Sequence, residues 1–102
     1  MIDQCGVVSD GLSGVSREAF LANKMIYDAT VMRLFTIGED ACNLSEAAQS
    51  LAPEIEWHQI RGLRNIIAHG YYEIAPERIW KSAVETLPSF RKGMEELLAR
   101  IP

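Results

Sequence analysis

Residues 64–72, RNIIAHGYY, place an arginine, an asparagine, a histidine and two tyrosines in one short segment. A guanidinium can bind phosphate through a planar pair of N–H groups, and an imidazole, with an ordinary pKa of about 6.5, can accept a proton near neutral pH. These groups suit RNA cleavage by the RNA's own 2′-hydroxyl. His69 would take the hydroxyl proton, and Arg64 would hold the phosphate and offset its developing charge.

Two further residues of this segment could support that chemistry. Asn65 can orient either group through hydrogen bonds, and the Tyr71 ring can stack on an unpaired base. Metal-assisted hydrolysis would need clustered carboxylates instead, and residues 57–72 contain no Asp or Glu. We therefore expect neither a metal nor another cofactor.

The polar residues before and within this segment have the spacing of one helical face. A helix is expected over about residues 57–69, and its polar positions lie three, four and four residues apart, at His58, Arg61, Asn65 and His69. The core-facing positions would be Ile60, Leu63, Ile66 and Ile67. The polar face lacks the Glu and Lys of an ordinary solvated surface, which favours a site. The alternative is a solvated face whose His69 and Tyr71 are partly buried residues of the helix end.

Arg64 and His69 are five residues apart, which separates them by about 140° around a regular helix. The sequence leaves two explanations open. The helix could loosen near Gly70, its expected C-terminal end, where a left-handed residue costs little, or a second subunit could complete the site. Two-fold dimers are the commonest oligomers, so the second explanation is physically reasonable.

The rest of the chain predicts an all-α bundle of four to five helices. Ser16 is expected to cap a helix over REAFLAN, and another short helix should begin at Ser45. Pro88 should bend or split the last helix near Thr86 or Leu87. The segment from about Asn23 to Leu44 is apolar on almost every side, so it should run through the bundle centre or pack against another subunit.

Several residues outside the motif could have either a structural or a functional role. Arg61 is a candidate for phosphate binding, and so is Arg33, although a charge in an apolar helix is more often structural. Trp57 and Trp80 are expected in the core. The acidic pairs, Glu39 with Asp40 and Glu95 with Glu96, are expected to face solvent.

Length and composition fit one domain over residues 1–102, because a single core typically serves about 100 to 150 residues. A net charge of −4 argues against broad, non-specific nucleic-acid binding but allows a local basic groove. Two cysteines are too few for a disulfide framework. The sequence shows no signal peptide and no membrane-spanning run, so we expect a cytoplasmic protein without a membrane partner.

The motif resembles a known family. Arg64, Asn65, His69 and Tyr71 match the Arg-x4-His-x-Tyr motif of HepT-type HEPN-domain ribonuclease toxins. The similarity extends over roughly residues 10–98, through the segments ATVMRLFTIGEDA, PEIEWHQIRGLRNIIAHGYY and ERIWKSAVETLP. Arg-x4-His alone is a weak pattern, whereas the longer form with its flanks is specific.

The resemblance implies a homodimeric HEPN bundle with its two motifs facing one another, acting as a metal-independent endoribonuclease on an RNA such as a tRNA or mRNA. Arg64 and His69 would be the catalytic pair, supported by Asn65 and Tyr71. It also implies an MntA-like nucleotidyltransferase antitoxin that attaches AMP to Tyr71. Two alternatives remain: a non-catalytic nucleotide- or substrate-binding subunit of a minimal nucleotidyltransferase, and a purely structural dimer module.

Overall fold

Helices are the regular elements of the part of the chain that the computed structural model describes, residues 1–70 and 74–101. They are α1 (Ile2–Gly11), α2 (Arg17–Ala22), α3 (Lys24–Cys42), α4 (Glu46–Ser50), α5 (Trp57–Gly70), α6 (Pro76–Lys81), the π-helical η2 (Ser82–Thr86) and α7 (Leu87–Arg100). This confirms the predicted all-α fold. The described segments outnumber the four to five predicted helices because α1 is a helix of its own and the last helix is divided into α6, η2 and α7.

Side-chain caps explain where three of the helices begin. The hydroxyl of Ser16 accepts a hydrogen bond from the backbone N–H of Ala19, 3.1 Å away. Asn23 caps α3 in the same way, since its side-chain oxygen accepts a hydrogen bond from the backbone N–H of Ile26. Ser45 caps α4 by accepting one from the backbone N–H of Ala48. Each cap satisfies a backbone donor that the first helical turn leaves without a partner. The predicted caps at Ser16 and Ser45 are confirmed.

Pro88 lies in the first turn of α7, directly after the π-helical segment η2. Proline has no N–H to donate, and its ring collides with the carbonyl four residues earlier in a regular α-helix. The wider π turn over residues 82–86 relieves that conflict without ending the helix. The division therefore falls at Leu87, as the sequence predicts.

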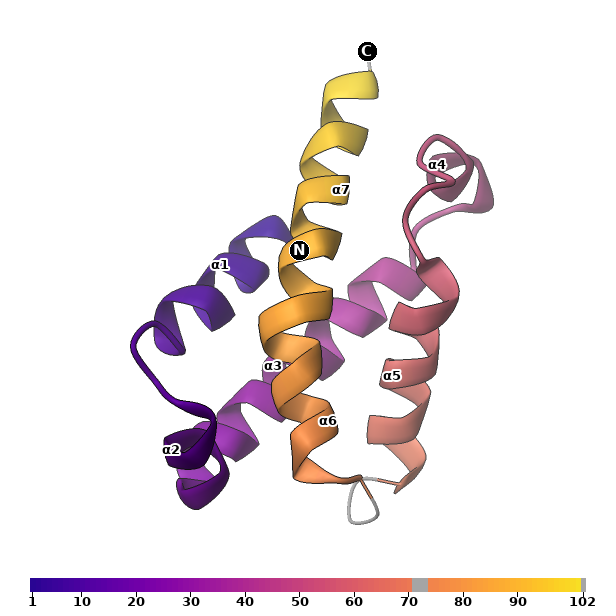
Figure 1. Cartoon of the computed structure of the whole chain (residues 1–102). Coiled ribbons are helices and arrows are strands. Elements are labelled where there is room, and N and C mark those ends of the chain that lie inside the picture. Colours follow the sequence, from indigo (N-terminus) through magenta and orange to yellow (C-terminus); the bar gives the residue numbers. More distant parts are fainter. Residues whose placement is uncertain (71–73, 102) are drawn as a thin grey trace.

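Figure 1 shows α3 crossing the bundle, with α5 along one side and α1 and α2 on the other. The continuous column of α6, η2 and α7 lies in front of α3. Cys5 lies in the core, and its burial raises the pKa of its thiol. Trp57 and Trp80 are half-buried and pack against the core. The fully buried side chains include Phe20, Ile37, Ile79 and Leu97.

One face of α3 is covered by the bundle, and another face is open. Its buried residues include Val31, Leu34 and Ile37, whereas Met25 is 84% exposed and Met32 is 63% exposed. The apolar pattern of this helix therefore arises from a core face together with an uncovered apolar face. Among the described residues, no helix combines the length and apolar character required to cross a membrane.

Candidate active site on helix α5

Helix α5 presents the predicted polar face to solvent. His58, Arg61, Asn65 and His69 are all exposed, and Ile60, Leu63 and Ile67 are buried. The division follows from the spacing of the apolar residues, which gives the helix one face for the core. The face predicted from the sequence is thus confirmed, with Arg64 half-buried at its edge.

The end of α5 differs from the prediction. Gly70 is still helical, and among the described residues Gly14 is the glycine with a positive φ. The loosening near Gly70 that the sequence leaves open is therefore absent up to this residue, and α5 stays regular through His69. Because the helix does not loosen, Arg64 and His69 point in different directions from one protomer. Tyr71, the motif's tyrosine, lies outside the described residues.

Arg64 turns toward α3 rather than toward His69. Its Nη1 atom lies 3.2 Å from Oε1 of Glu39, and its side chain is 27% exposed. The Arg64 Nε atom is buried without a hydrogen-bond partner. The stem of Arg64 passes over Gly38, where the Cβ of any larger residue would come within 2.8 Å of the arginine Cβ. The arginine is therefore held between two helices, with its Nε buried and about a quarter of its side chain exposed.

Glu39 is the residue of this site that sequence reasoning missed. The sequence predicts that it faces solvent with Asp40, but it is half-buried and paired with Arg64. Asp40 is exposed as predicted. The signal in the sequence is the neighbouring Gly38, because a glycine inside a helix weakens it and often marks a close approach of another element.

The two further arginine candidates lie on different sides of α3. Arg61 is exposed one turn before Arg64 on the same helix. Arg33 faces α1, where its Nη1 atom donates a 2.7 Å hydrogen bond to Oε1 of Gln4. The structure thus groups Arg61 with the motif and places Arg33 apart from it within one protomer.

An apolar groove of about 300 Å³ lies between α3 and α5, beside the motif. Its lining residues come from both helices: Asp28, Val31, Met32, Phe35, Ile67 and Ala68. Ala68 directly precedes His69 in the chain. The open apolar face of α3 therefore continues to the edge of the candidate site.

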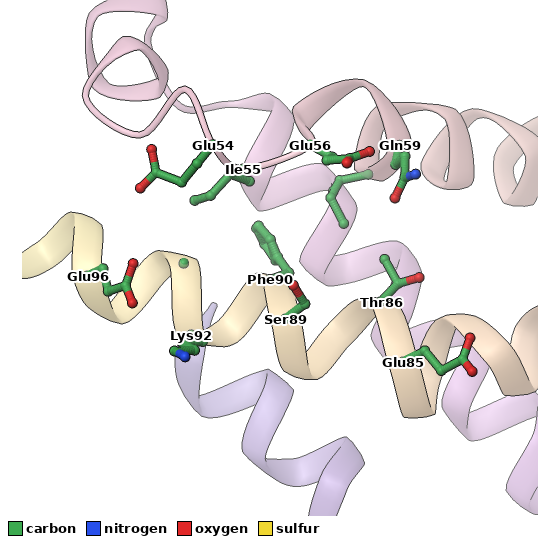
Figure 2. Close-up of a pocket in the computed structure, with 12 residues that line it drawn as sticks. Glu54, Ile55, Glu56, Gln59, Glu85, Thr86, Ser89, Phe90, Lys92 and Glu96 are labelled. Atoms are coloured by element: carbon green, nitrogen blue, oxygen red, sulfur yellow. The ribbon is translucent and has the colours of Figure 1, made fainter.

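A second cavity, of about 500 Å³, lies away from the motif (Figure 2). Helix α7 forms one side of it, and the segment that precedes α5 forms the other. Figure 2 shows the carboxylates of Glu54, Glu56, Glu85 and Glu96 around it. A backbone hydrogen bond and Arg100 lower the pKa of Glu54, which keeps that group negative. Carboxylates repel phosphate groups, so this cavity does not suit RNA.

The helical bundle has the exposed Arg61 and His69 and the half-buried Arg64 together on helix α5. This arrangement places the protein in the class of HEPN-like helical bundles. Residues 1–97 match the family model described as ribonuclease HepT-like. The chain therefore belongs to the HepT-like ribonuclease family.

Individual relatives agree with this family. A Thermococcus cleftensis protein named ribonuclease HepT is 31% identical over 80 residues, covering 78% of this chain and 73% of that protein. TTE0752 of Caldanaerobacter subterraneus, named as an RNase, is 25% identical over 98% of this chain and 89% of its own. MJ1380 of Methanocaldococcus jannaschii, also named as an RNase, is 28% identical over 93% of this chain and 87% of that protein. No solved structure gives a significant match.

Proposed function

We propose that the protein is the toxin of a toxin–antitoxin pair, an endoribonuclease that cuts RNA without a metal ion. The observation that carries the proposal is the exposed polar face of α5, where Arg61, Asn65 and His69 are accessible and Arg64 is partly so. In a chain of the HepT-like ribonuclease family, this face offers a proton acceptor and guanidinium groups for one phosphate.

The reaction needs only groups of the RNA and of the motif. His69 takes the proton of the 2′-hydroxyl, whose oxygen bonds to the adjacent phosphorus as the bond from phosphorus to the 5′-oxygen breaks. Arg64 stabilises the extra negative charge on the phosphate oxygens during this step. The leaving 5′-oxygen takes up one proton, either from water or from the protonated His69, and His69 thereby or afterwards returns to its neutral form. The products are a 2′,3′-cyclic phosphate and a 5′-hydroxyl.

The proposed site is shared by two copies of the chain. Arg64 and His69 diverge on the regular helix α5, so one motif alone does not direct both groups at one phosphate. The apolar groove between α3 and α5 borders the motif, and Met32 is 63% exposed in it. Packing two such faces together would bury apolar surface and bring His69 of one copy near Arg64 of the other.

We also propose that an MntA-like nucleotidyltransferase silences the toxin by attaching AMP to Tyr71. Tyr71 follows His69 by two positions in the sequence. An added phosphate carries negative charge and strong acceptor oxygens. It would compete with the RNA phosphate for the arginines of the motif helix and repel the RNA backbone.

The test is cleavage of labelled RNA by purified wild-type protein and by His69→Ala, with growth measured when each is expressed alone. We expect His69→Ala to lose at least about a hundredfold in rate, as for loss of a general base. Gln59→Ala is the control, because Gln59 is exposed on the same helix but lies outside the polar face formed by His58, Arg61, Asn65 and His69. Wild-type protein that neither cuts RNA nor slows growth would favour the binding-subunit alternative.

A further inference from the structure

The contact between Arg64 and α3 has a role in the proposed reaction. We propose that Glu39 is a positioning residue, which fixes the guanidinium of Arg64 in the orientation that receives the RNA phosphate. The inference rests on the proposed ribonuclease function and adds a residue from a second helix. It starts from the 3.2 Å contact between Glu39 Oε1 and Arg64 Nη1.

The close approach of the two helices places this carboxylate. Gly38 leaves room for the stem of Arg64, since a Cβ at position 38 would lie 2.8 Å from Cβ and 3.2 Å from Cγ of the arginine. Glu39 is the next residue on α3 and reaches the far end of the same side chain. The stem and the tip of Arg64 are thus both restrained by neighbouring residues of α3.

The hydrogen-bond donors of the Arg64 guanidinium show why its orientation depends on Glu39. A guanidinium has five N–H donors in a fixed planar fork. The Nε donor of Arg64 is buried without a partner, and one Nη group is occupied by Glu39. An unpartnered buried donor favours any rotation that brings it to water or to an acceptor. The carboxylate opposes that rotation and leaves the remaining Nη donors of this partly exposed side chain for phosphate.

Glu39 should have two effects on the proposed reaction that kinetics can separate. Its carboxylate is a negative charge beside the proposed phosphate site, and it also contacts the Arg64 guanidinium. As a charge, it weakens attraction for RNA, so its removal should not raise KM. As a positioning group, it keeps the guanidinium in place during the reaction, so its removal should lower kcat. Asp40 is an exposed neighbouring carboxylate, and it provides the matched control for charge alone.

The experiment compares Glu39→Ala, Glu39→Gln and Asp40→Ala in steady-state cleavage of an RNA oligonucleotide. We expect Glu39→Ala to lower kcat by about tenfold to a hundredfold, the scale of a small misplacement of a reacting group, without raising KM. Glu39→Gln keeps an oxygen acceptor and should retain most of kcat, and Asp40→Ala should resemble wild type. Equal kcat for Glu39→Ala and wild type, or an equal loss in Glu39→Gln, would overturn the proposal.

A second measurement separates this inference from the ribonuclease proposal. The Nε–Hε signal of Arg64 in a nitrogen-15 NMR spectrum, assigned by its absence in Arg64→Lys, reports directly on the held side chain. We expect slow hydrogen exchange in wild type and Glu39→Gln, and fast exchange or loss of the signal in Glu39→Ala. Unaltered exchange in a folded Glu39→Ala protein contradicts the positioning role. If wild type fails to cut RNA but the signal behaves as described, only the proposed function fails.

Discussion

At the scale of single residues, Arg64 has surroundings that suit a guanidinium and not merely a positive charge. Its Nη1 atom contacts Glu39, while its buried Nε is inaccessible to a ligand. A phosphate bound by Arg64, as proposed, would therefore lie at the end of the fork. A lysine at this position would keep the charge, but its ammonium could not contact Glu39 and phosphate in one fixed plane.

We accordingly expect Arg64→Lys to reduce kcat for RNA cleavage by roughly a hundredfold to a thousandfold, the usual effect of losing one donor to a transition-state oxyanion. Single-turnover rates with saturating protein would measure the chemical step separately from binding. Thermal unfolding of the variant serves as the control for folding. Near-wild-type cleavage by Arg64→Lys would mean that charge alone suffices and that the planar fork has no special role.

At the scale of elements, the packing of α3 on α5 depends on Gly38. An alanine there would bring its Cβ to 2.8 Å from Cβ of Arg64, and neither atom lies at the flexible end of a side chain. Gly62, on α5, has open space around it, since a Cβ there would meet no atom within 4 Å. Both positions are helical, so an alanine gains the same helix propensity at each, about 1 kcal/mol.

The two glycine substitutions should therefore differ in stability by the strain of overpacking alone. We expect Gly38→Ala to unfold with a free energy roughly 1–3 kcal/mol below that of Gly62→Ala. Urea unfolding followed by circular dichroism measures both values. Gly38→Ala should also lower RNA cleavage, because it displaces Arg64. Equal stabilities would show that the helices separate without cost and that Gly38 does not set their distance.

The helices themselves could be predicted from the sequence because their signals are local. Ser16 and Ser45 cap helices within three residues of themselves, and the apolar spacing of α5 predicts its buried face. The ion pair of Arg64 with Glu39 joins different helices, so it depends on how α3 and α5 pack, which no local pattern encodes. Gly70 is still helical, because a glycine permits a left-handed helix end without requiring one.

At the scale of the whole molecule, the proposed site depends on which copy of the chain supplies each catalytic group. Helix α5 remains regular from Trp57 to Gly70, which separates Arg64 and His69 by about 140° around its axis. A site within one protomer would require α5 to distort, whereas a shared site would not. The two arrangements make opposite predictions for mixtures of inactive variants.

We expect co-expressed Arg64→Ala and His69→Ala chains to recover RNA cleavage that neither variant has alone. The mixed dimer would combine His69 of the first chain with Arg64 of the second into one intact site. Random pairing would restore about a quarter of the wild-type sites, because half of the dimers are mixed and each has one of two sites intact.

The matched control pairs Arg64→Ala with a chain carrying both substitutions. This mixture has no Arg64 at all and should stay inactive. Cleavage at about a quarter of the wild-type rate in the first mixture, with none in the control, would place the two groups on different subunits. An inactive first mixture, with mixed dimers verified by differently tagged chains, would place both groups in one protomer. Helix α5 would then have to unwind near His69 when RNA binds.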